Sequence, residues 1–99
     1  MKRNRLSPVH PGEILREEFL GPLAMSSYAL AAALRVPRTR VERLVRAETA
    51  VTPDTALRLG RYFGTTPEFW LGIQARYDVD TARQSLDNDI AAIKPRKTA

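Results

Sequence analysis

Apolar residues recur about every three to four positions in five stretches of this chain, and polar or turn-forming residues separate the stretches. Such spacing is typical of amphipathic helices, and no stretch shows the alternation expected of a half-buried strand. The pattern therefore predicts an all-α fold without internal repeats. The expected helices cover residues 12–20, 26–34, 38–46, 53–63 and 67–86.

Start and stop signals mark the ends of these helices. Thr52-Pro53-Asp54 and Thr66-Pro67-Glu68 each place a capping hydroxyl, a proline and an acid where a helix begins. Gly21-Pro22 is expected to stop the first helix and Gly64 the fourth. In the fourth helix a glycine is expected to let a neighbouring helix approach closely. The inner stripe of that helix is formed by Ala56, Leu59, Gly60 and Phe63.

The second and third predicted helices are arranged as a helix-turn-helix over about residues 26–46. The two helices of such a motif pack closely, which favours small residues on the inner face of the first one, and Ala31 and Ala33 supply them. Val36 is expected to fill the corner. Pro37 restarts the chain at a first-turn position, where a missing N–H costs nothing.

The third helix has an apolar and a basic side. At about 100° per residue, Val41, Leu44 and Val45 fall together on the inner side. Five arginines between positions 35 and 46 face a single acid, Glu42, so ion pairs within the helix do not account for them. A solvated surface helix would also be basic, but the preceding helix and turn favour docking in a DNA major groove. The outward side carries Arg38, Thr39, Arg40, Arg43 and Arg46.

The composition narrows the class of protein. A chain of 99 residues forms one small domain. Cysteine is absent, which excludes disulfides and thiolate metal sites and suits a reducing cytosol. No apolar run approaches the roughly 20 residues needed to cross a bilayer, and the first residues do not form a signal core. The formal charge of +5 favours an anionic partner such as nucleic acid. We therefore expect a cytoplasmic protein that does not enter a membrane.

Residues able to carry out catalysis are few and scattered. His10 is the single histidine, and the helix dipole explains Glu13 beside it, so a metal site is not expected. Glu17 and Glu18 point about 100° apart on a helix and cannot converge on one substrate. No serine has a histidine near in sequence to activate it. We predict that the protein is not an enzyme and binds no cofactor or metal ion.

Five short motifs are specific as a set. They are His10-Pro11-Gly12-Glu13-Ile14-Leu15, Tyr28-Ala29-Leu30-Ala31, Val36-Pro37-Arg38-Thr39-Arg40, Thr55-Ala56-Leu57-Arg58-Leu59 and Gly64-Thr65-Thr66-Pro67-Glu68-Phe69-Trp70-Leu71. Together they resemble the HigA-type antitoxins, a branch of the phage-repressor (XRE) helix-turn-helix proteins, over about residues 8–83. The resemblance implies a five-helix homodimer that represses its own operon through double-stranded palindromic operator DNA. It also implies that the protein neutralises a HigB-type toxin, an mRNA-cleaving RNase of the RelE-like class.

The resemblance also assigns roles on the DNA-binding surface. Ser27 occupies the position where the first motif helix touches phosphate, and Tyr28 beside it belongs to the same surface. The expected base readers are Arg38, Thr39 and Arg43, and the expected backbone contacts are Arg40 and Arg46.

Three positions depart from the family pattern. Arg35 stands where the motif turn usually has glycine, so this arginine either keeps a left-handed backbone, at a cost of about 1 to 2 kcal/mol, or rearranges the turn. Ser27 replaces a longer glutamine. Arg46-Ala47-Glu48-Thr49 replaces Asn-Gly-Lys-Arg and introduces a carboxylate that repels phosphate. These changes bear on DNA affinity more than on the fold.

Two alternative functions share most of these features. A stand-alone transcriptional regulator would use the same DNA chemistry without a toxin. A toxin-binding module with weak or no DNA binding would explain Glu48 and the unusual turn.

The dimer contacts and the two ends of the chain complete the sequence predictions. The seam between two copies is expected along the fifth helix, at Phe69, Trp70, Ile73 and Tyr77. Residues 1–11 are expected to form a flexible arm before a domain that spans residues 12–86. Residues 87–99 are expected to be flexible, or to become helical on binding a partner, because Leu86, Ile90 and Ile93 recur at helical spacing.

Overall fold

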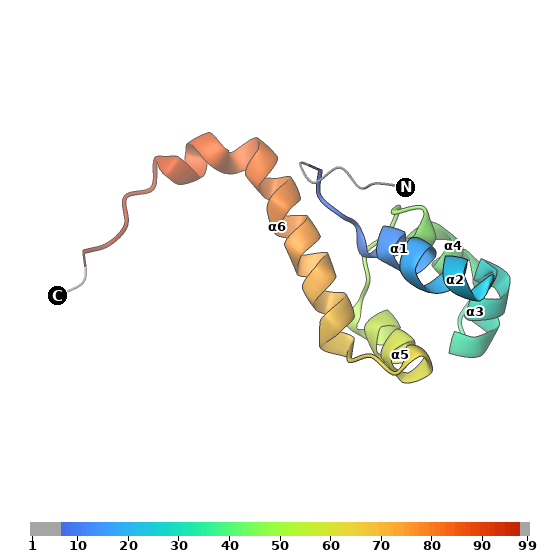
Figure 1. Cartoon of the computed structure of the whole chain (residues 1–99). Helices are drawn as coiled ribbons and strands as arrows, with labels where there is room; N and C mark the ends of the chain where they lie inside the picture. The colour runs from blue at the N-terminus through green and yellow to red at the C-terminus, as the bar shows by residue number, and fades with distance from the viewer. Residues whose placement is uncertain (1–6, 98–99) are drawn as a thin grey trace.

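Helices form all the regular structure of residues 7–97, the part of the chain that this computed structural model describes (Figure 1). The first helical run is continuous and consists of α1 (Pro11–Ile14), the π-helical segment η1 (Leu15–Leu20) and α2 (Gly21–Leu23). It is followed by α3 (Ser27–Leu34), α4 (Arg38–Val45), α5 (Pro53–Phe63) and α6 (Pro67–Ala91). Over this range the prediction of five helices without strands is confirmed.

The first helical run continues past Gly21-Pro22, so the predicted stop at this pair is wrong. In η1 the N–H of Gly21 donates to the carbonyl oxygen of Arg16, five residues back, and Pro22 has no N–H that needs a partner. The wider π turn also brings Leu15 and Leu20 to the same buried side. In an ordinary α-helix these two side chains would point about 140° apart.

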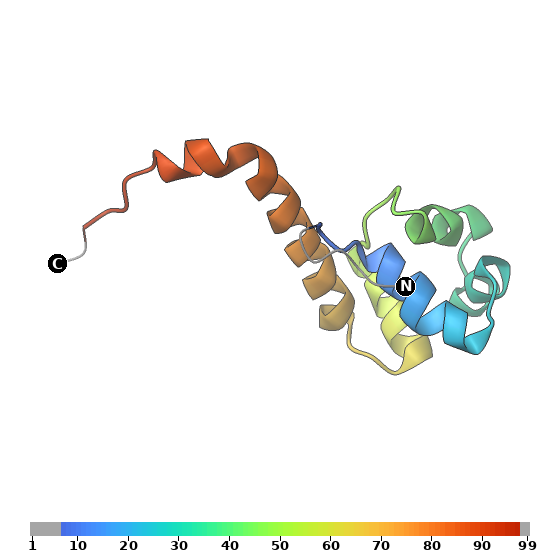
Figure 2. The same ribbon diagram turned by 45° about the horizontal axis from the view of Figure 1, so that its top comes forward.

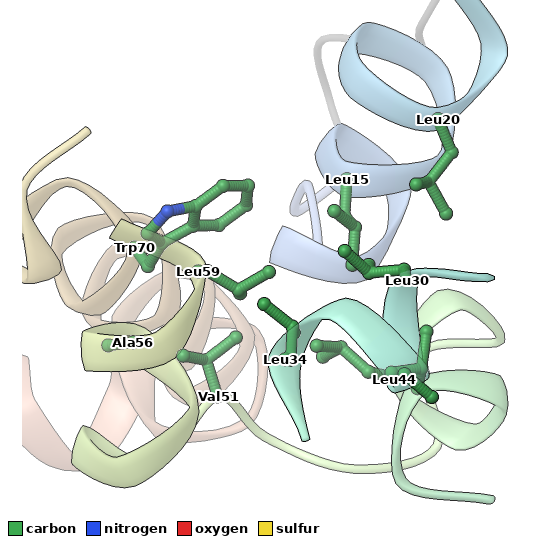
Figure 3. Packing of buried hydrophobic residues seen from close by; sticks show 11 residues of the cluster. Leu15, Leu20, Leu30, Leu34, Leu44, Val51, Ala56, Leu59 and Trp70 are labelled. Atoms are coloured by element: carbon green, nitrogen blue, oxygen red, sulfur yellow. The ribbon is translucent and has the colours of Figure 1, made fainter. Parts of the chain in front are cut away.

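The core lies where the first helical run, α3, α4, α5 and the start of α6 meet (Figure 3). Trp70 is fully buried there, and its Nε1 donates a hydrogen bond of 2.8 Å to Oγ1 of Thr65. The prediction that Trp70 lies at a dimer seam is therefore wrong, because its ring fills the core of a single chain. The buried hydrophobic residues are Leu15, Leu20, Leu30, Ala31, Leu34, Val41, Leu44, Val51, Ala56, Leu59 and Trp70.

Two glycines permit close backbone approach. A β-carbon on Gly12 would overlap the carbonyl oxygen of Leu44 near the end of α4. A β-carbon on Gly60 would lie 2.8 Å from the carbonyl oxygen of Thr65. The segment that approaches Gly60 is thus the turn between α5 and α6, and not the body of a neighbouring helix as predicted.

The predicted boundaries of α5 are confirmed. Oγ1 of Thr52 accepts the N–H of Thr55 at 3.3 Å, and Pro53 occupies the first turn. Gly64 ends the helix with a left-handed backbone, φ 74°. The start of α6 is built in the same way, since Oγ1 of Thr66 accepts an N–H at 3.1 Å.

α6 extends away from the other helices, and its carboxyl-terminal part has no neighbouring helix in either view (Figures 1 and 2). It ends at Ala91, beyond the predicted end near Leu86. The sequence between these residues contains neither glycine nor proline, and Pro95 follows only after the helix has ended. Over residues 7–97, no helix combines the length and the apolar character that crossing a membrane requires.

The end of the predicted amino-terminal arm is anchored. His10 is buried, its Nδ1 accepts the N–H of Gly12 at 2.9 Å, and its ring meets the ring of Tyr77 edge-on with centroids 4.8 Å apart. Pro11 is buried as well. The prediction of a flexible segment is therefore wrong for His10 and Pro11, while residues 1–6 lie outside the described part of the chain.

Candidate nucleic-acid interface

α3 and α4 pack against each other as the helix-turn-helix. α3 turns Leu30, Ala31 and Leu34 into the core, and α4 turns Val41 and Leu44 inward. Ala33 was also expected on the inner face, but it is exposed. It follows Ala31 by two positions, which rotates it about 200° around the helix.

The leading turn, defined as Arg35–Pro37, connects α3 to α4. Arg35 has a left-handed backbone, with φ 62° and ψ 45°. The N–H of Val36 donates to the carbonyl oxygen of Ala31 at 3.0 Å, which closes the end of α3. Of the two possibilities left open by the sequence, the retained left-handed turn is the one that forms.

Arg58 of α5 secures the leading turn. Its Nη1 donates to the carbonyl oxygens of Leu34, at 2.8 Å, and Arg35, at 3.4 Å. Its Nε donates to Oδ1 of Asp54 at 2.8 Å. The spacing of Asp54 and Arg58 is a detectable i, i+4 pair. No local pattern, however, indicates the contact with a turn more than twenty residues earlier in the chain.

The outward side of α4 is exposed, as predicted. Val41 and Leu44 are buried and Val45 is partly buried, so the inner side is also as predicted. All five residues expected to contact DNA from this helix and its end are exposed, namely Arg38, Thr39, Arg40, Arg43 and Arg46.

The expected DNA-binding residues of α3 and α4 meet across the leading turn. Tyr28 is 66% exposed. The guanidinium carbon of Arg38 lies over its ring, 5.9 Å from the centroid. This cation–π contact places Arg38 beside the first turn of α3, where Ser27 is half-buried. The two helices therefore present one continuous surface.

Two carboxylates lie within this basic surface. Oε2 of Glu42 lies 3.3 Å from Nε of Arg38, one helical turn away. Oδ1 of Asp54 lies 2.7 Å from Nη1 of Arg40. Sequence analysis found Glu42 and missed Asp54, because Asp54 reaches the surface from α5. A hydrogen bond from Arg58, and to a smaller extent one from Arg40, holds the pKa of Asp54 below its usual value.

The remaining positive charge on the outward side of α4 and its end belongs to two arginines. In the described part of the chain neither Arg43 nor Arg46 forms an ion pair. Both guanidinium groups are therefore available to an external anion.

The trailing corner, defined as Arg46–Glu48, follows α4. Ala47 has a left-handed backbone, φ 61°. The N–H of Glu48 donates to the carbonyl oxygen of Arg43 at 2.9 Å. Nη1 of Arg16 in η1 donates to the carbonyl oxygen of Val45 at 2.7 Å. The Glu48 side chain is exposed.

The single histidine has a structural role in this arrangement. Burial lowers the pKa of His10, and a hydrogen bond to the backbone of Thr49 and the charges of Asp78 and Glu13 partly oppose that shift. Between residues 7 and 97 there is no group of three or more histidine, cysteine or acidic residues that could hold a metal ion.

Comparison with known proteins places this surface in a family context. The helix-turn-helix family model matches residues 15–70. The chain is 49% identical over 82 residues to virulence-associated protein I of Dichelobacter nodosus, covering 83% of this chain and 76% of that protein. It is 37% identical over 95 residues to antitoxin HigA-1 of Vibrio cholerae, covering 96% and 90% respectively. The solved structure of Pseudomonas aeruginosa antitoxin HigA with the higBA promoter matches with a TM-score of 0.86 at 43% identity, covering 91% of this chain and 99% of that one.

Proposed function

We propose that this chain, which belongs to the HigA-type antitoxins of the helix-turn-helix family, binds its own operator DNA and represses the genes that follow. The observation that carries the proposal is the exposed basic side of α4, on which Arg43 and Arg46 have no ion pair in the described chain. The solved relative from Pseudomonas aeruginosa was determined with a promoter. These findings support the same chemistry in this protein.

The arginines divide into two roles in this proposal. Arg38 and Arg43 present guanidinium forks to guanine O6 and N7 in the major groove, and Thr39 adds a hydroxyl between them. The contact of the Arg38 guanidinium with the ring of Tyr28 supports this role. The residues proposed to meet the DNA backbone are Ser27, Tyr28, Arg40 and Arg46.

The active assembly is proposed to be a dimer, because two copies about 34 Å apart read a palindrome. Phe69 is 41% exposed. It lines a groove of about 600 Å³ together with Val9, Ile14 and Ile73. Tyr77 lies half-buried further along α6. We propose that a second copy covers this groove, with Phe69, Ile73 and Tyr77 at the seam. Light scattering should then give the mass of a dimer.

The second proposed partner is a HigB-type toxin, an RNase that acts on mRNA. The support is the relationship to proteins named HigA antitoxins. Co-expression of the chain with a toxin encoded beside it should restore growth, and the two proteins should co-purify. If growth were not restored, the chain would be better described as a stand-alone regulator.

Binding titrations with the DNA upstream of the gene and with a scrambled duplex test the DNA-binding proposal. Arg43→Ala should lose about 1 to 3 kcal/mol of discrimination at one base pair in each half-site. Arg46→Ala should weaken binding to both duplexes about equally. It should also reduce the slope of log affinity against log salt by about one. Arg83→Ala, an equal loss of charge on the exposed part of α6, is the control.

Unchanged DNA affinity in both Arg43→Ala and Arg46→Ala would show that α4 does not read DNA. The toxin-binding module without DNA binding would then be the better description.

A further inference from the structure

One carboxylate binds two arginines at the edge of the DNA-binding surface. Oδ1 of Asp54 accepts hydrogen bonds from Nη1 of Arg40, at 2.7 Å, and Nε of Arg58, at 2.8 Å. Arg40 comes from α4, whereas Asp54 and Arg58 come from α5. The Asp54 side chain is 54% exposed, so the bridge forms at the surface and not in the core.

The bridge lies in a cleft of about 500 Å³ between α4 and the start of α5. The cleft is lined by Thr39, Arg40, Arg43, Thr52, Asp54 and Thr55, among others. Hydroxyl and guanidinium groups are the donors that proteins use for phosphate oxygens, and the first turn of a helix adds partial positive charge. The Asp54 carboxylate, which belongs to the chain itself, already binds the guanidinium group of Arg40 in this cleft.

We infer that Asp54 competes with DNA phosphate for Arg40 and thereby limits the affinity of this surface for DNA. The inference rests on the proposed DNA binding. Arg40 must give up an ion pair before it reaches a phosphate, whereas Arg43 and Arg46 have none to lose. When Arg40 leaves, Arg58 continues to hold Asp54, so the carboxylate stays in place to take Arg40 back from the phosphate.

The bridge is also the feature that distinguishes Arg40 from Arg38. Arg38 pairs with Glu42 over 3.3 Å within a single helix. Arg40 pairs over 2.7 Å with a residue of another helix that is itself fixed by a second arginine. A fixed partner loses less side-chain entropy on pairing than a mobile one, so Asp54 is the stronger competitor.

Asp54→Asn tests the inference, because asparagine keeps the size and the acceptor oxygen but removes the charge. Binding of a scrambled duplex should tighten about two- to fivefold per bound chain, the range spanned by an exposed ion pair. The plot of log affinity against log salt should become steeper by about one per bound chain, since Arg40 gains a phosphate. Asp87→Asn, the same change on the exposed part of α6, is the matched control and should change neither quantity.

The Arg40→Ala background separates competition from general charge. If Asp54 acts through Arg40, adding Asp54→Asn to Arg40→Ala should leave affinity and slope unchanged. A gain that persists without Arg40 would overturn the inference, because it would show only the removal of a negative charge. Thermal unfolding checks that each variant is folded, and Asp54→Ser offers a second neutral variant at a helix start that Thr52 already caps.

The remaining outcomes distinguish the inference from the proposed function. If the wild type binds DNA and Asp54→Asn binds with the same affinity, the proposed role of Asp54 is overturned. Operator binding itself is then unaffected. Failure of both wild type and Asp54→Asn to bind any duplex, even at low salt, overturns both. Binding by Asp54→Asn alone supports the competition in its strongest form.

Discussion

The two ends of α4 turn in the same left-handed way but are held by different parts of the molecule. At the leading turn, Arg35 has φ 62°, and Arg58 of α5 donates to the carbonyl oxygens around it. At the trailing corner, Ala47 has φ 61°, and support comes from the first helical run. Arg16 donates to the last turn of α4, and Gly12 lies against the backbone of Leu44.

The difference shows that the position of α4 depends on two kinds of interaction. The leading turn is held by charged hydrogen bonds near the surface, which tolerate small movements and respond to solvent. The trailing corner is held by one charged hydrogen bond, from Arg16, and also by close backbone packing, which leaves no space for an added atom. Charge therefore matters at both ends of the helix, and only the trailing end is also sensitive to volume.

The largest effect is expected from Gly12→Ala at the trailing corner. The added methyl group overlaps the carbonyl oxygen of Leu44, so α1 and α4 must separate. We expect a loss of about 3 kcal/mol in the free energy of unfolding, measured by chemical denaturation. Gly72→Ala is the matched control: its added β-carbon meets nothing within 4 Å, so it should be neutral or stabilising. Equal stability of the two variants would contradict the packing argument.

A smaller loss is expected from Arg58→Met at the leading turn. The substitution keeps the apolar stem but removes the donors to Leu34 and Asp54, and we expect it to cost about 1 to 2 kcal/mol. Arg61→Met, on the same helix and exposed, should change stability by less than about 0.5 kcal/mol. A similar loss in both variants would mean that Arg58 contributes only general charge.

Acid should weaken the two ends of α4 in different pH ranges. The pKa of His10 is lowered in the folded chain, so its contribution is complete above the unfolded value near about 6.5 and is lost as pH falls from there. The pKa of Asp54 is also lowered, so its contribution persists down to about pH 4 and is lost below. Since His10 hydrogen-bonds to Thr49, beyond the trailing corner, that end should weaken first.

Thermal unfolding at a series of pH values measures both losses. His10→Gln should remove the change at mildly acidic pH and Asp54→Asn the change at lower pH. A His10→Gln variant with the same pH profile as the wild type would contradict this order.

The smallest effects are expected from glycine at the two left-handed positions. Arg35→Gly and Ala47→Gly each relieve about 1 to 2 kcal/mol of strain and lose part of it to the greater freedom of the unfolded chain, for a net gain of about 0.5 to 1 kcal/mol. Denaturation midpoints of the two variants provide the comparison. A gain at Ala47 together with a loss at Arg35 would show that the arginine side chain stabilises the turn.

Local signals predicted the parts of the fold that depend on neighbours in sequence. The threonine–proline starts of α5 and α6, and Gly64 at the end of α5, specify their own backbone conformations. The left-handed backbone at Arg35 was one of two possibilities that the resemblance to the family left open, because glycine usually occupies this place in the motif turn.

The predictions that failed depend on residues far apart in sequence or on a change of helix type. Trp70 has the spacing of a surface stripe, and only the packing of α6 against the core shows that its ring is buried. Pro22 is expected to end the first helix unless the π turn before it is known. By contrast, the exposed arginines of the site were predicted correctly from the sequence of α4 alone. The contact between Arg40 and Asp54 requires the placement of α5 against α4.

The far end of α6 has a thermodynamic consequence of its own. Residues 81–97 are exposed throughout, so the last turns of this helix can unwind without opening the core. An isolated helix of fewer than about 12 residues is marginal in water. Amide protons on these turns should exchange at rates close to those of a free peptide, while those of buried α3 residues should wait for global unfolding. The end of α6 is therefore a peptide whose folding equilibrium is separate from that of the domain to which it is attached.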